Sequence, residues 1–182
     1  LLCGGMAMAA PPEIPPPEIA APAWVLMDHH SGQVLAERNS DKLLAPASLT
    51  KLMTAYVLFA KLKDGKLRLD DAIAISPQAV KARGARLFLR PGTTARAEDL
   101  LRGMIVVSAN DAAVALAEHV AKNEASFVME MNLAARALGL SRTSFVNVTG
   151  HDEPGQASTA HYLARLTSDL IRDFPDYYEW FA

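Results

Sequence analysis

The sequence predicts a mixed α/β (α+β) fold in which a short antiparallel hairpin precedes a helical region. The first observation is a pair of strand-like segments, Trp24–Asp28 and Gln33–Arg38, on either side of a turn that contains Gly32. The second is that the long apolar segments after Ser48 have helical spacing and helix-cap signals. An isolated two-stranded hairpin is not stable. We therefore expect that the helices cover it, or that further strands of an antiparallel sheet lie beyond Ala182.

The composition fits one ordinary globular domain. The chain has 182 residues, of which 51% are hydrophobic, so it can bury a sizeable core. The net charge of −2 gives no support to binding of nucleic acid. No apolar run approaches the roughly 20 residues that a membrane-spanning helix needs.

The first 23 residues are expected to lie outside that domain. Residues 1–9 resemble the end of a signal peptide, because they are apolar and Ala7-Met8-Ala9 fits a small-x-small cleavage site. Residues 10–23 contain six prolines and predict a stiff, extended linker. The only cysteine, Cys3, falls in the signal, so the exported protein would rely on its core and not on disulfides. We expect the folded domain to span residues 24–182.

The helical region begins at Ser48. Leu52 to Ala60 is a run of nine uncharged residues, which predicts a helix from Ser48 to about Lys63 that is buried on nearly all sides. Asp64-Gly65 ends it. The expected elements that follow are an irregular or extended piece at 67–75, a short helix at 76–81 capped by Ser76, an extended piece at 87–89, helices at 97–106, 112–121 and 124–138, an irregular stretch at 141–150, and a last helix after Ser158-Thr159 through Asp173.

A serine and a lysine stand three residues apart at the start of the buried helix. Positions i and i+3 share one helix face, so Ser48 and Lys51 should point the same way. A lysine at the mouth of a buried helix must be paired or have a lowered pKa, and a neutral lysine beside a hydroxyl is a base beside a nucleophile. The alternative is that Ser48 is a plain N-cap and Lys51 a surface residue.

A second polar pair interrupts the helices. In a turn or extended segment Ser108 and Asn110 would face the same side, which offers a hydroxyl for proton relay and an amide that can donate and accept. The alternative is that one of them only caps the helix at 112–121.

Together the two pairs resemble a known family, the serine-type D-Ala-D-Ala carboxypeptidases or low-molecular-mass penicillin-binding proteins (peptidase S11). Their sites combine Ser-x-x-Lys, Ser-x-Asn and Lys-Thr-Gly motifs. The resemblance runs from Trp24 to about Asp173. It includes Asp28-His29-His30-Ser31-Gly32-Gln33-Val34-Leu35, Pro46 to Thr54, Glu98 to Ala113, and Phe145 to Gly150, in order.

The resemblance implies a fold, an activity and residue roles. The fold would be β-lactamase/transpeptidase-like, with an antiparallel sheet and a helical subdomain, and residues 24–182 would be the N-terminal part of its catalytic domain. Ser48 would be the acylated nucleophile, Lys51 its base and Ser108 a proton relay, while Asn110 would bind the substrate's amide. The substrate would be a peptidoglycan stem peptide ending in D-Ala-D-Ala, with β-lactams as covalent inhibitors. It also implies a part in cell-wall synthesis and cell shape, in the periplasm or peripherally on the outer face of the inner membrane.

The third motif does not occur in the sequence. There is no Lys-Thr-Gly, and the last lysine is Lys122. We therefore expect the chain to be truncated before the late strands of the sheet, and a fragment of this length to be inactive. Two alternatives remain open: a D,D-endopeptidase of the same family, and a non-catalytic module that binds peptidoglycan or β-lactams.

Other hydrolase classes fit less well. The class A β-lactamases need a Glu-x-x-x-Asn segment, which is absent between Asn110 and Ala182. The histidines occur in no His-Glu-x-x-His pattern, and no serine lies in Gly-x-Ser-x-Gly. The adjacent His29 and His30 are interpreted as solvated turn residues. We expect no metal and no cofactor.

Overall fold

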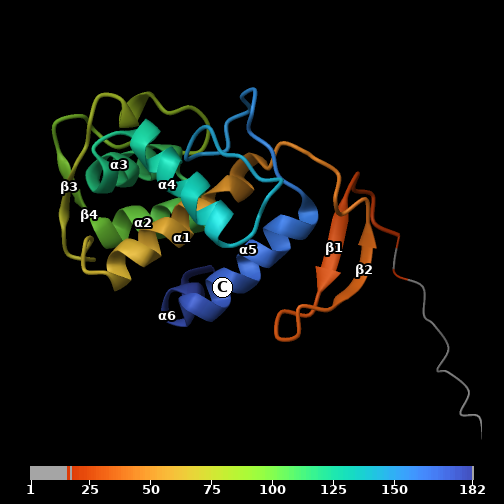
Figure 1. The fold of residues 1–182 in the computed structure, drawn as a ribbon. Coiled ribbons are helices and arrows are strands. Elements are labelled where there is room, and N and C mark those ends of the chain that lie inside the picture. Colours follow the sequence, from red (N-terminus) through yellow and green to blue (C-terminus); the bar gives the residue numbers. More distant parts are fainter. Residues whose placement is uncertain (1–15, 17, 182) are drawn as a thin grey trace, which may run out of the picture.

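The protein is described by a computed structural model that covers residue 16 and residues 18–181. Figure 1 shows a hairpin at one side of the molecule and a group of helices at the other, with α5 between them. The elements are β1 (Trp24–Met27), β2 (Val34–Arg38), η1 (Ala47–Leu49), α1 (Thr50–Lys63), β3 (Ala72–Ala74), η2 (Ala79–Lys81), β4 (Thr94–Arg96), α2 (Ala97–Val106), α3 (Asn110–Ala121), α4 (Glu124–Ala137), α5 (Ala160–Asp173), α6 (Pro175–Tyr178) and η3 (Glu179–Phe181).

The predicted hairpin is present, and a helix covers one of its faces. Strands β1 and β2 pair antiparallel, with Trp24 opposite Arg38 and a register shift after Leu26. Helix α5 packs against β1 (Figure 1). Leu26 and Leu35 of the hairpin are more than half exposed. Of the two alternatives that the sequence left open, cover by a helix is thus present for part of the hairpin among the described residues.

Helix α1 is the centre of the fold. It packs against α2, α3, α4 and α5, and most of its side chains are buried, as the uncharged run predicted. Its start differs from the prediction, because Ser48 lies in the 3-10 turn η1 and the α-helix begins at Thr50. Ser48 and Lys51 therefore lie in two successive elements, with the exposed serine in η1 and the buried lysine in the first turn of α1.

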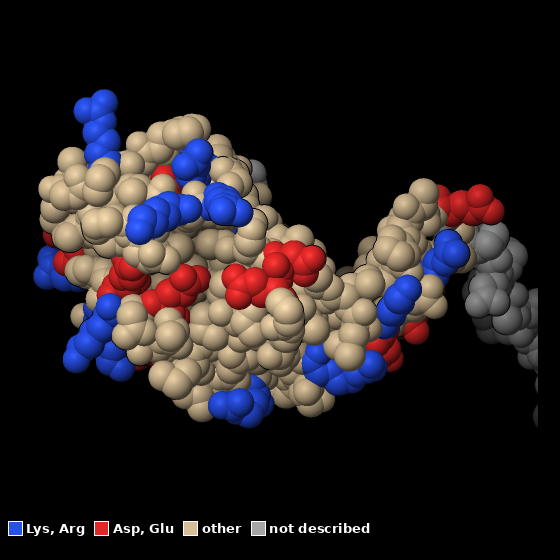
Figure 2. Space-filling model, turned by 90° about the horizontal axis from the view of Figure 1, so that it is seen from above, with Lys and Arg blue, Asp and Glu red and all other residues tan. Residues whose placement is uncertain are grey.

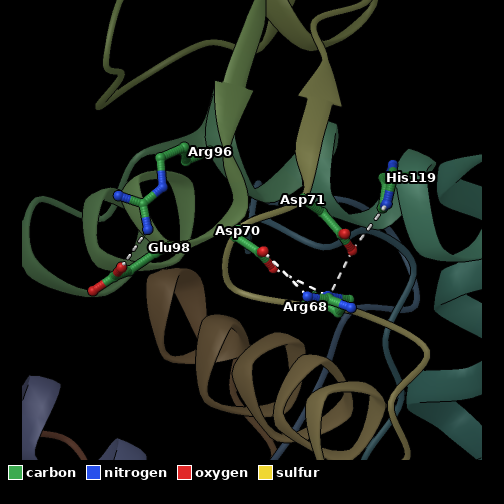
Figure 3. A network of polar contacts seen from close by, with 6 residues as sticks. All are labelled: Arg68, Asp70, Asp71, Arg96, Glu98 and His119. Carbon is green, nitrogen blue, oxygen red and sulfur yellow. Dashed lines mark hydrogen bonds and ion pairs between the residues drawn. The ribbon is translucent and has the colours of Figure 1, made fainter.

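A second small sheet was not predicted. Strands β3 and β4 pair antiparallel, with Ile73 opposite Ala95, and Ile73 is fully buried. The sequence predicts only an irregular or extended piece at 67–75, and does not predict that β3 within it pairs with β4. Figure 3 shows polar side chains at the base of this hairpin, with distances of 3.1 Å for Arg68–Asp70, 3.1 Å for Arg96–Glu98 and 3.9 Å for His119–Asp71.

The aromatic residues at the end of the described chain pack on the fold itself. The Phe59 ring of α1 stacks on Tyr177 at 4.8 Å and meets Trp180 edge-on, while the Arg102 guanidinium lies 4.5 Å from the Trp180 ring centroid. Aromatic burial of this kind contributes the largest apolar areas in a core. Helices α1 and α2 therefore cover part of these aromatic rings.

The expected segments at the start of the chain are mostly beyond what is described. The proposed signal remnant, residues 1–9, lies outside the described residues, as does half of the linker at 10–23. Residues 18–23 have no helix or strand. Among the residues that are described, no helix combines the length and hydrophobicity needed to cross a membrane.

Candidate active site

Ser48 is an exposed hydroxyl at a sharp turn into the central helix. Ala47, just before it, has a positive φ of 48°, which reverses the chain so that Ser48 stands at the mouth of α1. Within the described part of the chain the hydroxyl has no hydrogen-bond partner. The free backbone N–H groups at a helix start can stabilise a negative oxygen placed beside this serine.

Lys51 is one turn further on and is almost completely buried, with 6% of its surface exposed. Its Nζ donates a hydrogen bond to the carbonyl oxygen of Thr149 at 2.8 Å. Burial lowers the pKa of Lys51 from 10.5 to about 8, and no carboxylate among the described residues counters this effect. A substantial neutral fraction near neutral pH makes this amine able to accept a proton.

The loop at 145–151 lies against both residues. Gly150 packs so closely on the turn before α1 that a Cβ atom on it would stand 1.8 Å from the carbonyl oxygen of Ala47 and 2.9 Å from the Ser48 nitrogen. Gly150 also has a φ of +87°, which favours glycine. On α1, the Thr54 hydroxyl donates to the carbonyl of Val148 at 2.8 Å. This loop therefore forms one wall beside Ser48 and Lys51.

Ser108 lies in the break between α2 and α3, as predicted, but Asn110 belongs to α3 and not to the same turn or extended segment. Ser108 has a positive φ of 58°, and Asn110 is the first residue of α3, with neither side chain capping that helix. The Asn110 amide nitrogen donates to the carbonyl of Arg83, and its backbone N–H donates to Ala85 at 2.8 Å. Its Oδ1 is buried and has no partner among the described residues. An unpaired buried acceptor of this kind is free for an N–H donor from a ligand.

A cavity of about 550 Å³ joins Asn110 to the Thr149 loop. Asn110 and Thr149 both line it, and Thr149 is the residue that binds Lys51. Charged side chains of both signs line it, namely Lys81, Arg83, Glu124 and Glu153, together with His151. The structure thus brings Asn110 and Lys51 to one region of the molecule. Figure 2 shows acidic and basic side chains interspersed on the upper face, with no continuous basic stripe on the face shown.

A buried carboxylate holds the segment that faces Asn110. Asp111, 1% exposed, accepts hydrogen bonds from the backbone N–H groups of Leu87 at 2.9 Å and Leu89 at 3.1 Å. The extended piece predicted at 87–89 therefore has no partner strand, because the Asp111 side chain accepts its backbone N–H groups instead. In the sequence, Asp111 is notable only as part of the resemblance.

Replacing Asp111 by alanine is expected to destabilise the protein by about 2–3 kcal/mol, because two backbone donors lose a charged acceptor. Asp111→Asn keeps one acceptor oxygen and should cost less. The matched control is Asp99→Ala, which removes an exposed acid from the first turn of α2 and should cost no more than about 1 kcal/mol. Urea unfolding of the full natural protein measures all three. Equal losses for Asp111→Ala and Asp99→Ala would contradict this role.

The residues that hold the loop were not predicted individually. They are Asn147, Thr149, Gly150 and Gln156. The only local signal for them is Asn147 three residues before Gly150, a spacing typical of a turn. No group of three or more His, Cys, Asp or Glu side chains among the described residues could hold a metal ion.

The chain resembles one family in sequence over nearly its whole length. The family described as D-alanyl-D-alanine carboxypeptidase (peptidase S11) matches residues 8–181. The D-alanyl-D-alanine carboxypeptidase DacC of Escherichia coli is 45% identical over 178 residues, which are 94% of this chain and 44% of that protein. A D-alanyl-D-alanine endopeptidase of Pseudomonas aeruginosa is 35% identical and is matched over 51% of its length.

Solved structures show the same fold. Penicillin-binding protein 5 of Haemophilus influenzae superposes with a TM-score of 0.89 at 42% identity, covering 92% of this chain and 50% of that one. Penicillin-binding protein 6B of Escherichia coli gives a TM-score of 0.86 at 40% identity. The transpeptidase-like fold predicted from the sequence is confirmed. The chain spans about half the length of the relatives that it matches.

Proposed function

Because this chain belongs to the D-alanyl-D-alanine carboxypeptidase family (peptidase S11), we propose that the protein containing it removes the terminal D-alanine from peptidoglycan stem pentapeptides through an acyl-enzyme on Ser48. The observation that carries the proposal is the pairing of an exposed serine with a buried lysine one turn later, whose pKa is lowered by burial to about 8. An amine that is partly neutral near neutral pH supports a role for Lys51 as the base and for Ser48 as the nucleophile.

The proposed roles are those that the family resemblance implies for these four residues. The neutral amine of Lys51 takes the proton from the Ser48 hydroxyl as its oxygen attacks the carbonyl of the penultimate D-alanine. Ser108 passes a proton to the nitrogen of the departing D-alanine. Water then attacks the ester, its proton is taken up by the same relay, and Ser48 is released as the hydroxyl. Asn110 binds the peptide amide, and its unpaired buried Oδ1 supports that role.

The proposal extends to partners and location. β-Lactams would acylate Ser48 because they present a carbonyl in the same place as the peptide. We propose that residues 1–9 are the end of a signal peptide and residues 10–23 a linker, so that the domain at 24–182 acts in the periplasm, free or peripheral to the inner membrane. The third motif, absent from this sequence, would come from chain beyond Ala182. The match to relatives about twice as long supports that proposal.

The test is to locate the covalent adduct. We expect that the full natural protein, treated with a penicillin and digested, carries the added mass on the peptide that contains Ser48 and not on the one that contains Ser108. Release of D-alanine from a pentapeptide ending in D-Ala-D-Ala measures the hydrolysis itself. A folded, full-length sample that shows neither adduct nor D-alanine release would contradict the proposal.

The same full-length protein can be used to test the two alternatives, a D,D-endopeptidase and a non-catalytic binding module. The similarity to the Pseudomonas endopeptidase favours a D,D-endopeptidase as the second candidate. That enzyme would cleave a cross-linked peptide dimer faster than a pentapeptide. A non-catalytic binding module would bind peptidoglycan without forming any adduct.

A further inference from the structure

We propose that Gln156, together with Asn147, is a positioning residue for Lys51 that acts through the backbone carbonyl of Thr149. The role of Lys51 as the base rests on the function proposed above. The arrangement of Gln156 and Asn147 does not, because it is read directly from hydrogen bonds, two of which join residues 98 and 106 positions apart in the sequence.

Asn147 holds the turn that contains the Thr149 carbonyl. Asn147 Oδ1 accepts hydrogen bonds from the Gly150 N–H at 2.8 Å and from the Thr149 N–H at 3.3 Å. Its Nδ2 donates to the carbonyl of His151 at 2.9 Å. One buried side chain therefore binds three consecutive residues of the turn. This fixes the direction of the Thr149 carbonyl, the acceptor of the Lys51 ammonium.

Gln156 links this turn to α1. Gln156 is 5% exposed, and its Oε1 accepts from the Val146 N–H at 2.7 Å. Its Nε2 donates to Asn147 Oδ1 at 3.2 Å and to the hydroxyl of Thr50 at 3.0 Å. Thr50 is fully buried and is the neighbour of Lys51 in α1. A single carboxamide thus sets the loop in register with the helix that carries the lysine.

Backbone hydrogen bonds of the following residues hold Gln156 in place. The next two residues form β-bridges, Ala157 with Ser144 and Ser158 with Leu44, with N–H to O distances of 2.9–3.0 Å. Leu44 leads into the turn that presents Ser48. The segment that fixes Gln156 therefore also anchors the approach to the serine, and any shift of the carboxamide would change the geometry of both ends of the Ser48–Lys51 pair.

The electrostatic surroundings leave the carbonyl as the main polar partner of Lys51. The titratable groups of the neighbouring cavity are Glu124, Glu153, His151, Lys81 and Arg83, and Glu124 is engaged with the Val148 N–H at 3.1 Å. Burial is the cause of the lowered pKa of Lys51, with no charged group contributing. Losing the carbonyl would remove a hydrogen bond that stabilises the ammonium form, so the pKa of Lys51 should fall further.

The test uses Gln156→Met, which keeps length and neutrality but removes both hydrogen-bonding ends. In the full natural protein we expect acylation of Ser48 by a fluorescent penicillin to slow about 10- to 100-fold through misplacement of the base. We expect the midpoint of the pH–rate curve to move about one unit to lower pH. Thr50→Val removes the acceptor on α1 and should shift the curve in the same direction. The double variant should be non-additive, because both changes break one link.

Asn132→Leu is the matched control. Asn132 is a carboxamide on α4 that holds the same loop at Phe145, with bonds of 2.8 and 3.0 Å. It should lower the melting temperature while leaving the midpoint of the pH–rate curve in place. A Gln156→Met protein that loses stability but keeps the parental midpoint and a rate within about twofold would overturn the proposal, since this would be a structural role only.

A second measurement is independent of activity. Titration of the Lys51 amine by NMR, with lysine labelled at Nζ, should show the same lowering of its pKa in Gln156→Met and none in Asn132→Leu. If the parent forms no adduct on Ser48, the function proposed above fails while this titration still decides whether Gln156 positions Lys51. An unchanged Lys51 titration in Gln156→Met overturns the inference.

Discussion

Replacement of Lys51 by methionine is expected to slow acylation of Ser48 by a penicillin about 10³-fold or more in the full natural protein. Methionine fills a similar volume in the buried site but cannot accept the proton of the Ser48 hydroxyl. Lys51→Arg should be as slow, because arginine stays protonated and so cannot act as a base. Ser48→Ala, which has no nucleophile, supplies the zero of the assay.

The pH dependence of the parent checks the same role. The reactive form is the neutral amine, and the neutral fraction grows as the pH rises through the Lys51 pKa of about 8. The acylation rate should therefore rise with pH, with a midpoint near pH 8, and level off about one unit above it. Lys51→Met should show no such rise. A Lys51→Arg protein that acylates within about tenfold of the parent would contradict the assignment of Lys51 as the base.

Gly150→Ala is expected to slow acylation at least about 100-fold and to destabilise the protein by about 2–4 kcal/mol. The added Cβ would lie 1.8 Å from the Ala47 carbonyl oxygen, and because that is a backbone atom, either the turn before Ser48 or the loop must move. The φ of +87° adds the conformational cost that any L-residue pays there. Moving the loop away from the turn would displace both the backbone at Ser48 and the Thr149 carbonyl that binds Lys51.

Gly155→Ala is the matched control for this change. Gly155 follows this loop by four residues and has a φ of +94°, but its nearest neighbour, Val146 Cγ1, is 3.3 Å from an added Cβ. It should carry the conformational cost without the backbone clash. Acylation rates and urea midpoints of the two variants separate these terms. Equal slowing in both would mean that the close approach of Gly150 to Ala47 has no part in shaping the site.

Local signals in the sequence placed most helices. Helix α2 has the bounds 97–106 that its apolar spacing predicted, and α5 begins after Thr159, whose hydroxyl accepts from the Tyr162 N–H at 3.1 Å. The β3–β4 hairpin was missed because Thr94–Arg96 has neither alternation nor a strong apolar face, and only the burial of Ile73 against α3 explains its pairing. Helix α3 starts at Asn110, two residues early, where its N–H binds Ala85.

The sequence by itself determined the family resemblance, the hairpin, the buried central helix and the four candidate residues, because spacing and residue type are properties of neighbouring positions. Only the tertiary structure decided how Lys51 is held and what stands beside Ser48. Gln156 and Thr50 are 106 residues apart, and Lys51 and Thr149 are 98 apart. Bonds over such separations leave no periodicity in the chain, since they depend on packing that brings an irregular loop against a helix.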